Sequence, residues 1–234
     1  MQETLDLGRI VVLALADSVN PCAIAILTMV LLTVLTSDPT KKKKVLLSGL
    51  AFISSIMIGY LFYGIVIVQL FKTIGEFISH YSIYLYNGLA IFAMLMGGLQ
   101  IKDFFLYKKG SFGTEMPLWM RPKAKKVINN ITSPRGAFII GFLVTVFLLP
   151  CTIGPYIIAS ALLSPLGILQ SIPWLILYNF IFVIPMFIIV LIVYYGIKKV
   201  DEVSGWKEKN IKILHLIAGI LLFLVGFSLL IGFI

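Results

Sequence analysis

Charged side chains are scarce in this sequence. Of the 234 residues, 12% are charged and 60% are hydrophobic, whereas ordinary soluble domains are about 25% charged and about 45–50% apolar. The polar residues are too few to cover the long apolar stretches in water, which excludes a water-soluble globular enzyme. Cysteine is scarce as well. With two cysteines, the chain cannot be a small scaffold held together by disulfides.

Histidine is equally rare, and this bears on metal binding. The two histidines, His80 and His215, fall on opposite predicted sides of the membrane, so we expect no metal site. Nucleic acid is not an expected partner either, because the basic residues are divided among short loops and no nucleic-acid-binding motif accompanies them.

Apolar stretches long enough to cross a membrane dominate the sequence. A helix needs about 20 apolar residues to cross a hydrocarbon core of about 30 Å, and the stretches that qualify are 10–35, 45–71, 81–101, 137–163, 171–197 and 213–234. None shows the alternation of polar and apolar residues that is typical of membrane β-strands. The sequence therefore predicts an all-α, polytopic membrane protein with six transmembrane helices.

The basic residues predict the orientation of these helices. All but two of the 19 Lys and Arg residues lie in the segments 41–44, 102–135 and 198–212. By the positive-inside rule these segments are cytoplasmic, and both chain termini are outside. We therefore expect a multi-pass plasma-membrane protein whose net charge of +9 reflects its topology. Docking of anionic lipid or an acidic partner on the basic loops is the alternative interpretation.

The chain divides into two related halves. A basic connector, 102–136, separates three predicted helices in 1–101 from three in 137–234. An odd number of helices in each half makes the second half enter the membrane in the opposite sense. Pro21-Cys22 recurs 129 residues later as Pro150-Cys151. We therefore expect a three-plus-three inverted repeat, which is typical of alternating-access transporters with broken helices.

Each Pro-Cys pair falls near the middle of its apolar stretch. Proline removes a backbone donor and clashes with the preceding turn, so we expect both helices to kink or break there. Asn20-Pro21 reads as an N-cap and a first helical position, which places Cys22 in the first turn of a half-helix. The two cysteines could serve packing alone. Because they occupy corresponding positions in the two halves, we favour a reversible disulfide, which requires that the half-helices meet.

The stretch Asn20-Pro21-Cys22-Ala23, together with Leu-Pro-Cys-Thr-Ile-Gly-Pro-Tyr at 149–156, resembles the paired motifs of the CcdA family and of the transmembrane domain of DsbD. The resemblance implies a thiol-disulfide oxidoreductase that carries electrons across the membrane, with Cys22 and Cys151 as its catalytic pair and no bound cofactor. It implies cytoplasmic thioredoxin as the electron donor and thioredoxin-like acceptors outside, serving cytochrome c maturation and related reductions.

Both motifs contain residues that we expect to break the helices or to support the breaks. They are Asn20, Pro21, Pro150, Gly154 and Pro155. The first half lacks the second proline that many family members have two residues after the cysteine. We therefore expect the two helices to break unequally.

Asp17 is the one carboxylate inside a predicted span, five residues before Cys22. Acidic residues within a membrane are costly, which makes them functional candidates. We expect Asp17 either to take up protons or to stabilise the broken backbone. For Asn179, the expectation is an interhelical hydrogen bond.

Two other functions fit the same scaffold less well. One is a small-solute or ion exporter, in which the prolines shape the substrate site and the thiols are incidental. The other is a quinone-linked disulfide-generating enzyme. The latter is disfavoured because the sequence has no Cys-x-x-Cys motif.

Overall fold

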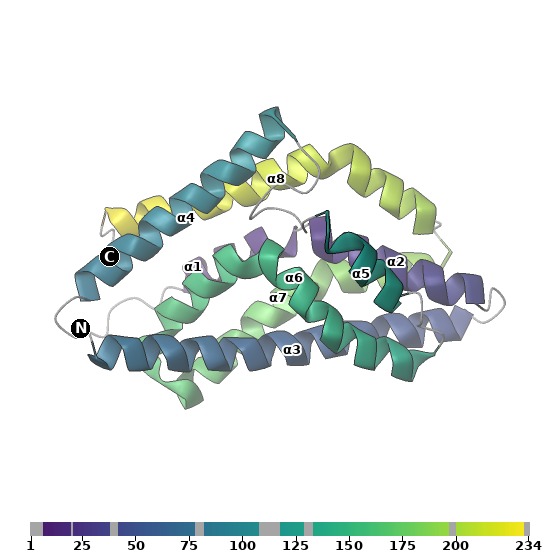
Figure 1. Ribbon diagram of the computed structural model, residues 1–234, viewed down its shortest axis with the longest axis horizontal. Coiled ribbons are helices and arrows are strands. Elements are labelled where there is room, and N and C mark those ends of the chain that lie inside the picture. The colour runs from purple at the N-terminus through teal and green to yellow at the C-terminus, as the bar shows by residue number, and fades with distance from the viewer. Residues whose placement is uncertain are drawn as a thin grey trace.

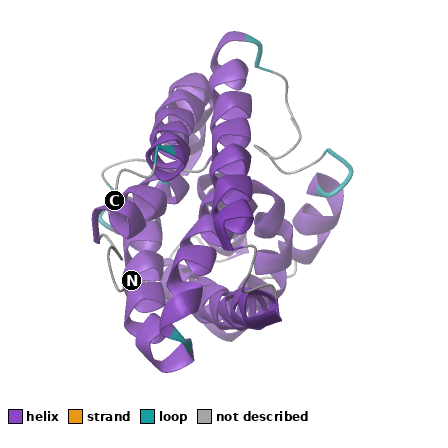
Figure 2. Ribbon diagram, turned by 90° about the vertical axis from the view of Figure 1, so that its left-hand side faces the viewer, coloured by secondary structure: helices purple, strands orange, loops and turns teal. Residues whose placement is uncertain are grey.

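The computed structural model describes residues 7–19, 21–37, 42–77, 82–107, 118–128, 133–196 and 200–231, and these are almost entirely helical (Figure 1). The helices are α1 (Leu7–Ser18), α2 (Pro21–Ser37), α3 (Lys42–Phe77), α4 (Ser82–Phe105), α5 (Arg121–Ile128), α6 (Pro134–Leu163), the 3-10 helix η2 (Ser164–Leu166), α7 (Ile168–Tyr194) and α8 (Val200–Leu230). None of the described residues lies in a strand (Figure 2). The all-α prediction is therefore confirmed.

Several helices are long and apolar enough to cross a membrane. They are α3, α4, α7 and α8, and the bent pair α1 and α2 counts as a fifth if the two form one span. In α6 the apolar stretches among the described residues are shorter, Pro134–Val146 and Gly154–Leu166. The protein is thus a helical membrane protein with four or five candidate spans in the described residues, against the six that the sequence predicts.

The two Pro-Cys motifs behave differently in the fold. Pro21 begins α2, where its missing N–H and fixed φ suit a first helical position, and the chain bends by 50° between α1 and α2. This places Cys22 in the first turn of α2, as predicted. By contrast, α6 runs through Pro150 as one helix, although its ribbon changes direction along its length (Figure 1). The expected break is therefore present in the first half, and the second half has a continuous helix.

The helices form a layered bundle (Figure 1). In this bundle α3 packs against α6 and α7, α1 packs against α6, α7 and α8, and α4 packs mainly along α8. The end of α3, the end of α8 and the junction of α6 and α7 lie at the same end of the molecule (Figure 1). The beginnings of α3, α6 and α8 lie at the opposite end (Figure 1).

Glycines bring the backbones of α4 and α8 into direct contact. A Cβ atom added at Gly97 would lie 2.7 Å from the backbone nitrogen of Phe223, and one at Gly219 would lie 2.9 Å from the carbonyl oxygen of Gly97. Close approach of this kind is how membrane helices gain van der Waals contact, because surrounding lipid tails provide no hydrophobic driving force. The α4–α8 pair is therefore held by packing at small residues.

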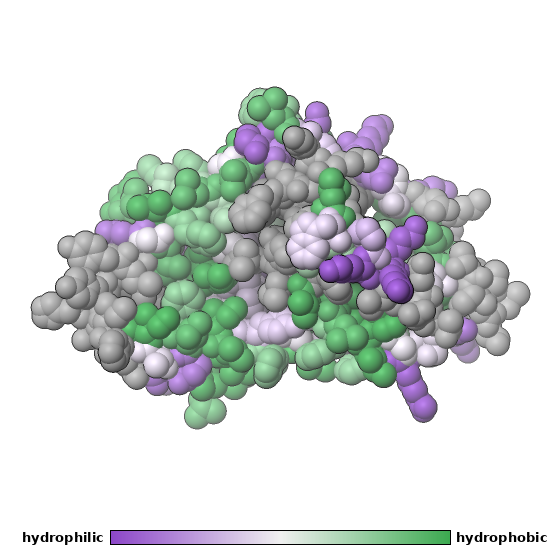
Figure 3. All heavy atoms as spheres, in the orientation of Figure 1, coloured by the Kyte–Doolittle hydropathy of each residue, from purple (hydrophilic) through white to green (hydrophobic). Residues whose placement is uncertain are grey.

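The outer surface is largely apolar, as a lipid-facing surface must be. Large exposed apolar side chains include Ile58, Phe62, Leu95, Phe180 and Leu224. Hydrophilic residues gather mainly towards the half of the molecule that holds α5 and the start of α6 (Figure 3). On this face, the polar surface is therefore distributed unevenly along the molecule.

Candidate functional site at the break between α1 and α2

A buried carboxylate marks the end of α1. Asp17 lies in the last turn of this helix and is 1% exposed. The hydroxyl of Tyr178, on α7, donates a hydrogen bond to the Asp17 Oδ2 atom at 3.1 Å. The same hydroxyl lies 3.5 Å from the carbonyl oxygen of Leu13. Tyr178 therefore ties the middle of α7 to the end of α1 beside the break.

Two further tyrosines continue this contact into the bundle. Tyr156, on α6, donates its hydroxyl hydrogen to the carbonyl oxygen of Tyr60, on α3. The Tyr60 hydroxyl in turn lies 2.8 Å from the Thr152 Oγ1 atom of α6. The rings of Tyr156 and Tyr178 meet edge to face with centroids 5.2 Å apart, and those of Tyr60 and Tyr156 do so at 5.3 Å. We call Tyr60, Tyr156 and Tyr178 the tyrosine cluster.

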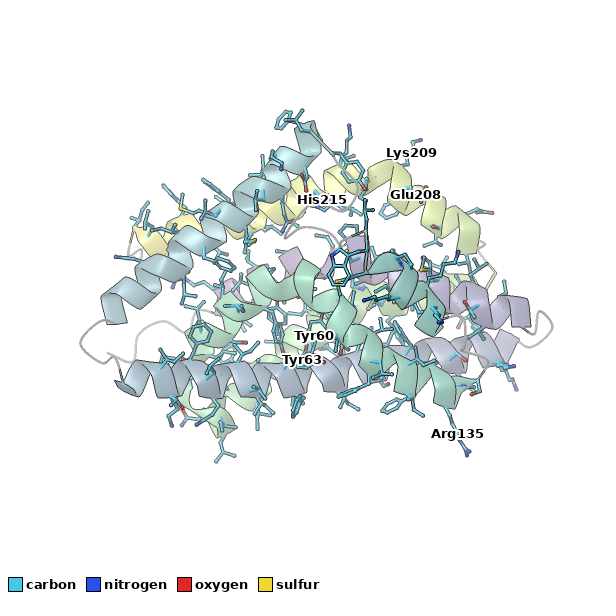
Figure 4. The ribbon with its side chains drawn as sticks, in the orientation of Figure 1. Tyr60, Tyr63, Arg135, Glu208, Lys209 and His215 are labelled. Atoms are coloured by element: carbon cyan, nitrogen blue, oxygen red, sulfur yellow. The ribbon has the colours of Figure 1, made fainter. Side chains whose placement is uncertain are left out.

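The tyrosine cluster joins helices from both halves of the chain. Tyr60 lies on the α3 side that faces α6, and its neighbour Tyr63 makes a second bond across the same interface, 3.0 Å from the Thr145 Oγ1 atom (Figure 4). Asn179 follows Tyr178 and is fully buried. Among the described residues its amide makes no hydrogen bond, so the predicted interhelical bond of Asn179 is not found there. The hydrogen bonds of the tyrosine cluster thus join α1, α3, α6 and α7.

An apolar cavity lies on the other side of the α1–α2 break. Its volume is about 320 Å³. The lining residues come from the end of α1, from α2, α7 and α8, and they are Ser18, Val19, Ile24, Pro185, Ile188, Ile189, Ile192, Val203, Trp206 and Leu214. Cavities of ~300–1,000 Å³ are typical of small-molecule sites. A group that fills this one would have to be apolar.

The carboxylate and the cavity are adjacent along the chain. Asp17 turns towards Tyr178, and the next two residues, Ser18 and Val19, line the cavity. The chain bends by 50° between α1 and α2. The end of α1 can therefore contact the tyrosine cluster on one side and the cavity on the other. The break therefore connects a polar interior site with an apolar one.

The structure locates most of the other predicted site residues. Pro21 and Cys22 are buried at the start of α2. Gly154 and Pro155 are buried in α6, where a Cβ atom on Gly154 would lie 3.5 Å from Met96 of α4 and 3.6 Å from Leu222 of α8. Gly154 therefore faces the α4–α8 pair.

Some predicted residues fall outside the described part of the structure. Asn20 lies in a gap between the described ranges, so its capping role stays a prediction. The backbone at Pro150 and Cys151 is helical, but their side chains are not among those described, and the distance between the two sulfurs is not defined. Within the described residues, no three His, Cys, Asp or Glu side chains are placed to share a metal ion.

The sequence reasoning missed the tyrosine cluster and the cavity. A signal for the tyrosines was present, because Tyr60, Tyr156 and Tyr178 lie well inside apolar stretches. Membrane tyrosines gather at the interfaces, so a tyrosine at mid-span needs a partner for its hydroxyl inside the protein. The cavity has no comparable signal, since its lining is ordinary apolar sequence from four helices.

A family model described as Sap, sulfolipid-1-addressing protein, matches residues 10–232 of the chain. No curated protein and no solved structure gives a match. The family match contradicts the resemblance to the CcdA family that the Pro-Cys motifs indicated. The functions that this resemblance implied are therefore wrong as well. They were thiol-disulfide electron transfer by Cys22 and Cys151 and a role in cytochrome c maturation.

The reason for this error is physical. A proline at a helix break followed by a small buried residue serves any membrane bundle that needs a bend, and cysteine is a common buried residue. Two such dipeptides are weak markers of chemistry. The family match, in contrast, extends from within α1 to beyond the end of α8. The chain therefore belongs to the Sap, sulfolipid-1-addressing protein, family.

Proposed function

We propose that this protein binds a negatively charged lipid and helps to move it through the membrane. The observation that carries the proposal is the apolar cavity of about 320 Å³ at the α1–α2 break. Its size suits part of an acyl chain. The name of the matched family refers to a sulfolipid, which combines apolar chains with an anionic headgroup.

Lipid binding in the cavity has to depend on the shape of the cavity and on the charge beside it. A lipid chain leaves one apolar environment for another when it enters the protein from the bilayer, so the hydrophobic effect contributes little. Contact with the closely spaced isoleucines of α7 then supplies packing energy, and the headgroup supplies selectivity. Trp206, 49% exposed at the edge of the cavity, has the amphipathic ring that favours the headgroup layer.

The charge of the chain favours an anionic headgroup. Exposed Lys209 and Lys212 follow Trp206 on α8 within two helical turns. The net charge is +9, and basic residues near a membrane surface attract anionic lipids. A lipid with its chain in the cavity and its headgroup beside this part of α8 would satisfy both requirements.

The proposal includes six spans in two inverted halves, with the α1–α2 pair as the first span and α6 as the fourth. Helix packing supports this arrangement. The helices that correspond in the two halves pack against each other, α3 with α7 and α4 with α8. A two-fold axis that relates the halves would exchange α3 with α7 and α6 with the α1–α2 pair. It would therefore turn the contact between α3 and α6 into one between α7 and α1, and both contacts are present. The cavity combines the break of the first half with α7 and α8 of the second.

The orientation follows from the same arrangement. With six spans, the three connections that hold most of the basic residues fall on the same side of the membrane, and the positive-inside rule makes this side cytoplasmic. The termini would then be outside. The lipid-binding cavity would have its Trp206 edge near the cytoplasmic surface.

Filling the cavity tests the proposal. Ile188→Trp places an indole where the acyl chain would lie, and overpacking of this kind costs about 1–3 kcal/mol. We expect about fivefold to 150-fold weaker binding of a fluorescent two-chain lipid with a sulfate headgroup, measured by anisotropy with protein in lipid nanodiscs. The matched control is Ile184→Trp, one turn earlier on α7 and outside the cavity lining.

Two outcomes would contradict the proposal. One is equal affinity of the wild type for the sulfate lipid and for the same lipid with a phosphocholine headgroup. The other is an Ile188→Trp variant that binds as tightly as Ile184→Trp.

A further inference from the structure

The position of Asp17 suggests how lipid movement is driven. Its carboxylate accepts the Tyr178 hydrogen bond inside the bundle, while Ser18 and Val19, the next residues, line the apolar cavity. A movement of the end of α1 would therefore change both the contact with Tyr178 and the lining of the cavity. A group that switches between two charge states at this point can affect the shape of the cavity.

The ionised and protonated forms of Asp17 interact differently with their surroundings. An ionised carboxylate inside a membrane bundle is costly unless it is neutralised or well hydrogen-bonded. The negative end of the α1 dipole disfavours the charge at this position, while the positive end of α2, a few residues on, favours it. The forces at the α1–α2 break therefore depend on whether the carboxylate holds a proton.

We propose that Asp17 is a proton-binding site, and that its protonation is coupled to the occupation of the cavity by lipid. The inference rests on the proposed function, and it adds the ion that would drive or gate the movement. The step is the uptake of one proton from water by the carboxylate, which becomes a carboxylic acid. It involves no redox change and no other reactant.

The groups that face Asp17 from the neighbouring helices are tyrosines. Tyr178 of α7 donates a hydrogen bond to it, the ring of Tyr156 on α6 packs edge to face against Tyr178, and Tyr60 of α3 is next in the cluster. On α2, Cys22 lies in the first helical turn. The tyrosine and cysteine side chains are neutral in their ordinary forms, and the Tyr178 hydroxyl stabilises a charge on Asp17 by hydrogen bonding.

The basic groups of α1 and α8 have different surroundings from those of Asp17. Arg9, at the other end of α1, bonds through its guanidinium to Ser228 of α8 at 3.4 Å. His215 of α8 lies beside the Tyr107 ring, with centroids 6.1 Å apart. Lys209 and Lys212 of α8 are exposed. His215 is therefore the group to control for, since a histidine titrates near neutral pH.

The test measures binding of the sulfate lipid to protein in nanodiscs from about pH 5 to 9, the range in which buried carboxylates can titrate. A sulfate headgroup stays ionised throughout, so a pH response comes from the protein. We expect the wild-type affinity to change about tenfold across one proton-binding transition. A pH indicator in weakly buffered solution should register proton exchange as lipid binds.

Asp17→Asn is the decisive variant. We expect it to bind the lipid with an affinity that does not vary with pH, and without proton exchange. The matched controls are Asp103→Asn, a fully buried carboxylate on α4, and His215→Asn. Both should keep the wild-type pH response.

The possible failures are distinguishable. If the wild type does not bind the lipid at any pH, the proposed function itself fails. If the wild type binds but its affinity and proton count do not vary with pH, or if Asp17→Asn keeps the wild-type response, the proton-binding role of Asp17 is wrong. Should Asp17→Asn fail to fold, Tyr178→Phe replaces it. Loss of its hydrogen bond to the carboxylate should displace the pH midpoint by about one unit, and an unchanged midpoint would overturn the inference.

Discussion

At the scale of single residues, the tyrosine cluster solves the problem of placing hydroxyl groups inside a membrane bundle. A hydroxyl without a partner is costly in an apolar interior. Tyr156 and Tyr178 each donate to an acceptor on a different helix, and Tyr60 bonds to Thr152. The large rings fill the space between helices, and their hydroxyl groups fix which helix turns lie opposite each other.

Removing one of these hydroxyl groups should loosen a specific helix contact. Tyr156→Phe loses the bond to the Tyr60 carbonyl between α6 and α3. Hydrogen bonds between membrane helices are worth about 0.6 kcal/mol on average and up to about 1.7 kcal/mol. We expect destabilisation in this range, measured by unfolding in mixed micelles with increasing denaturing detergent.

The control for this prediction is Tyr194→Phe, at the end of α7 and half-buried. It should change the stability by less than Tyr156→Phe does. Equal stability of Tyr156→Phe and the wild type would mean that the bond does not hold the two helices together.

Sequence reasoning reached some of these residues and missed others for identifiable reasons. Pro21 and Asp17 were predictable, because a proline and an acid inside an apolar stretch each have strong local consequences. The role of Tyr178 was not, since it depends on which face of α7 meets α1. The prediction of thiol chemistry depended too strongly on the two Pro-Cys dipeptides, because a dipeptide does not specify a reaction.

At the scale of elements, the helices follow closely from the apolar stretches. The predicted span 45–71 lies inside α3, and 137–163 lies inside α6. The two Pro-Cys motifs do differ, but in the opposite sense to the one that the missing second proline suggests: the chain bends by 50° at the motif that lacks this proline, whereas α6 is one helix through Pro150 and Pro155. What the sequence could not give is the pairing of helices, because apolar faces of similar composition fit many partners.

The pairing of α4 with α8 makes a sharp prediction at this scale. Gly97→Ala places a methyl group against the backbone of Phe223, which cannot yield without moving the helix. We expect a loss of about 1–3 kcal/mol in stability. Gly98→Ala, the next residue, meets nothing within 4 Å and should be neutral or slightly stabilising, since alanine favours helices over glycine. Equal effects of the two substitutions in a thermal-shift or detergent-unfolding series would contradict this packing.

At the scale of the whole molecule, the cavity is lined by residues from both halves of the chain. The break after α1 comes from the first half, and α7 and α8 come from the second. A relative movement of the halves would change the cavity and the contact between Asp17 and Tyr178 together. No local motif encodes such a site, which is why the sequence predicted a membrane bundle correctly and assigned it the wrong chemistry.

The most direct test of lipid binding is photocrosslinking in membranes. The probe is a sulfate lipid whose acyl chain ends in a diazirine, and the adducts are located by peptide mass spectrometry. Binding in the cavity predicts adducts on Ile188, Ile192 and Trp206 that disappear when unlabelled sulfate lipid is in excess. Adducts confined to outward-facing residues such as Phe180 and Leu224, or adducts that the competitor does not reduce, would show that the cavity is not the lipid-binding site.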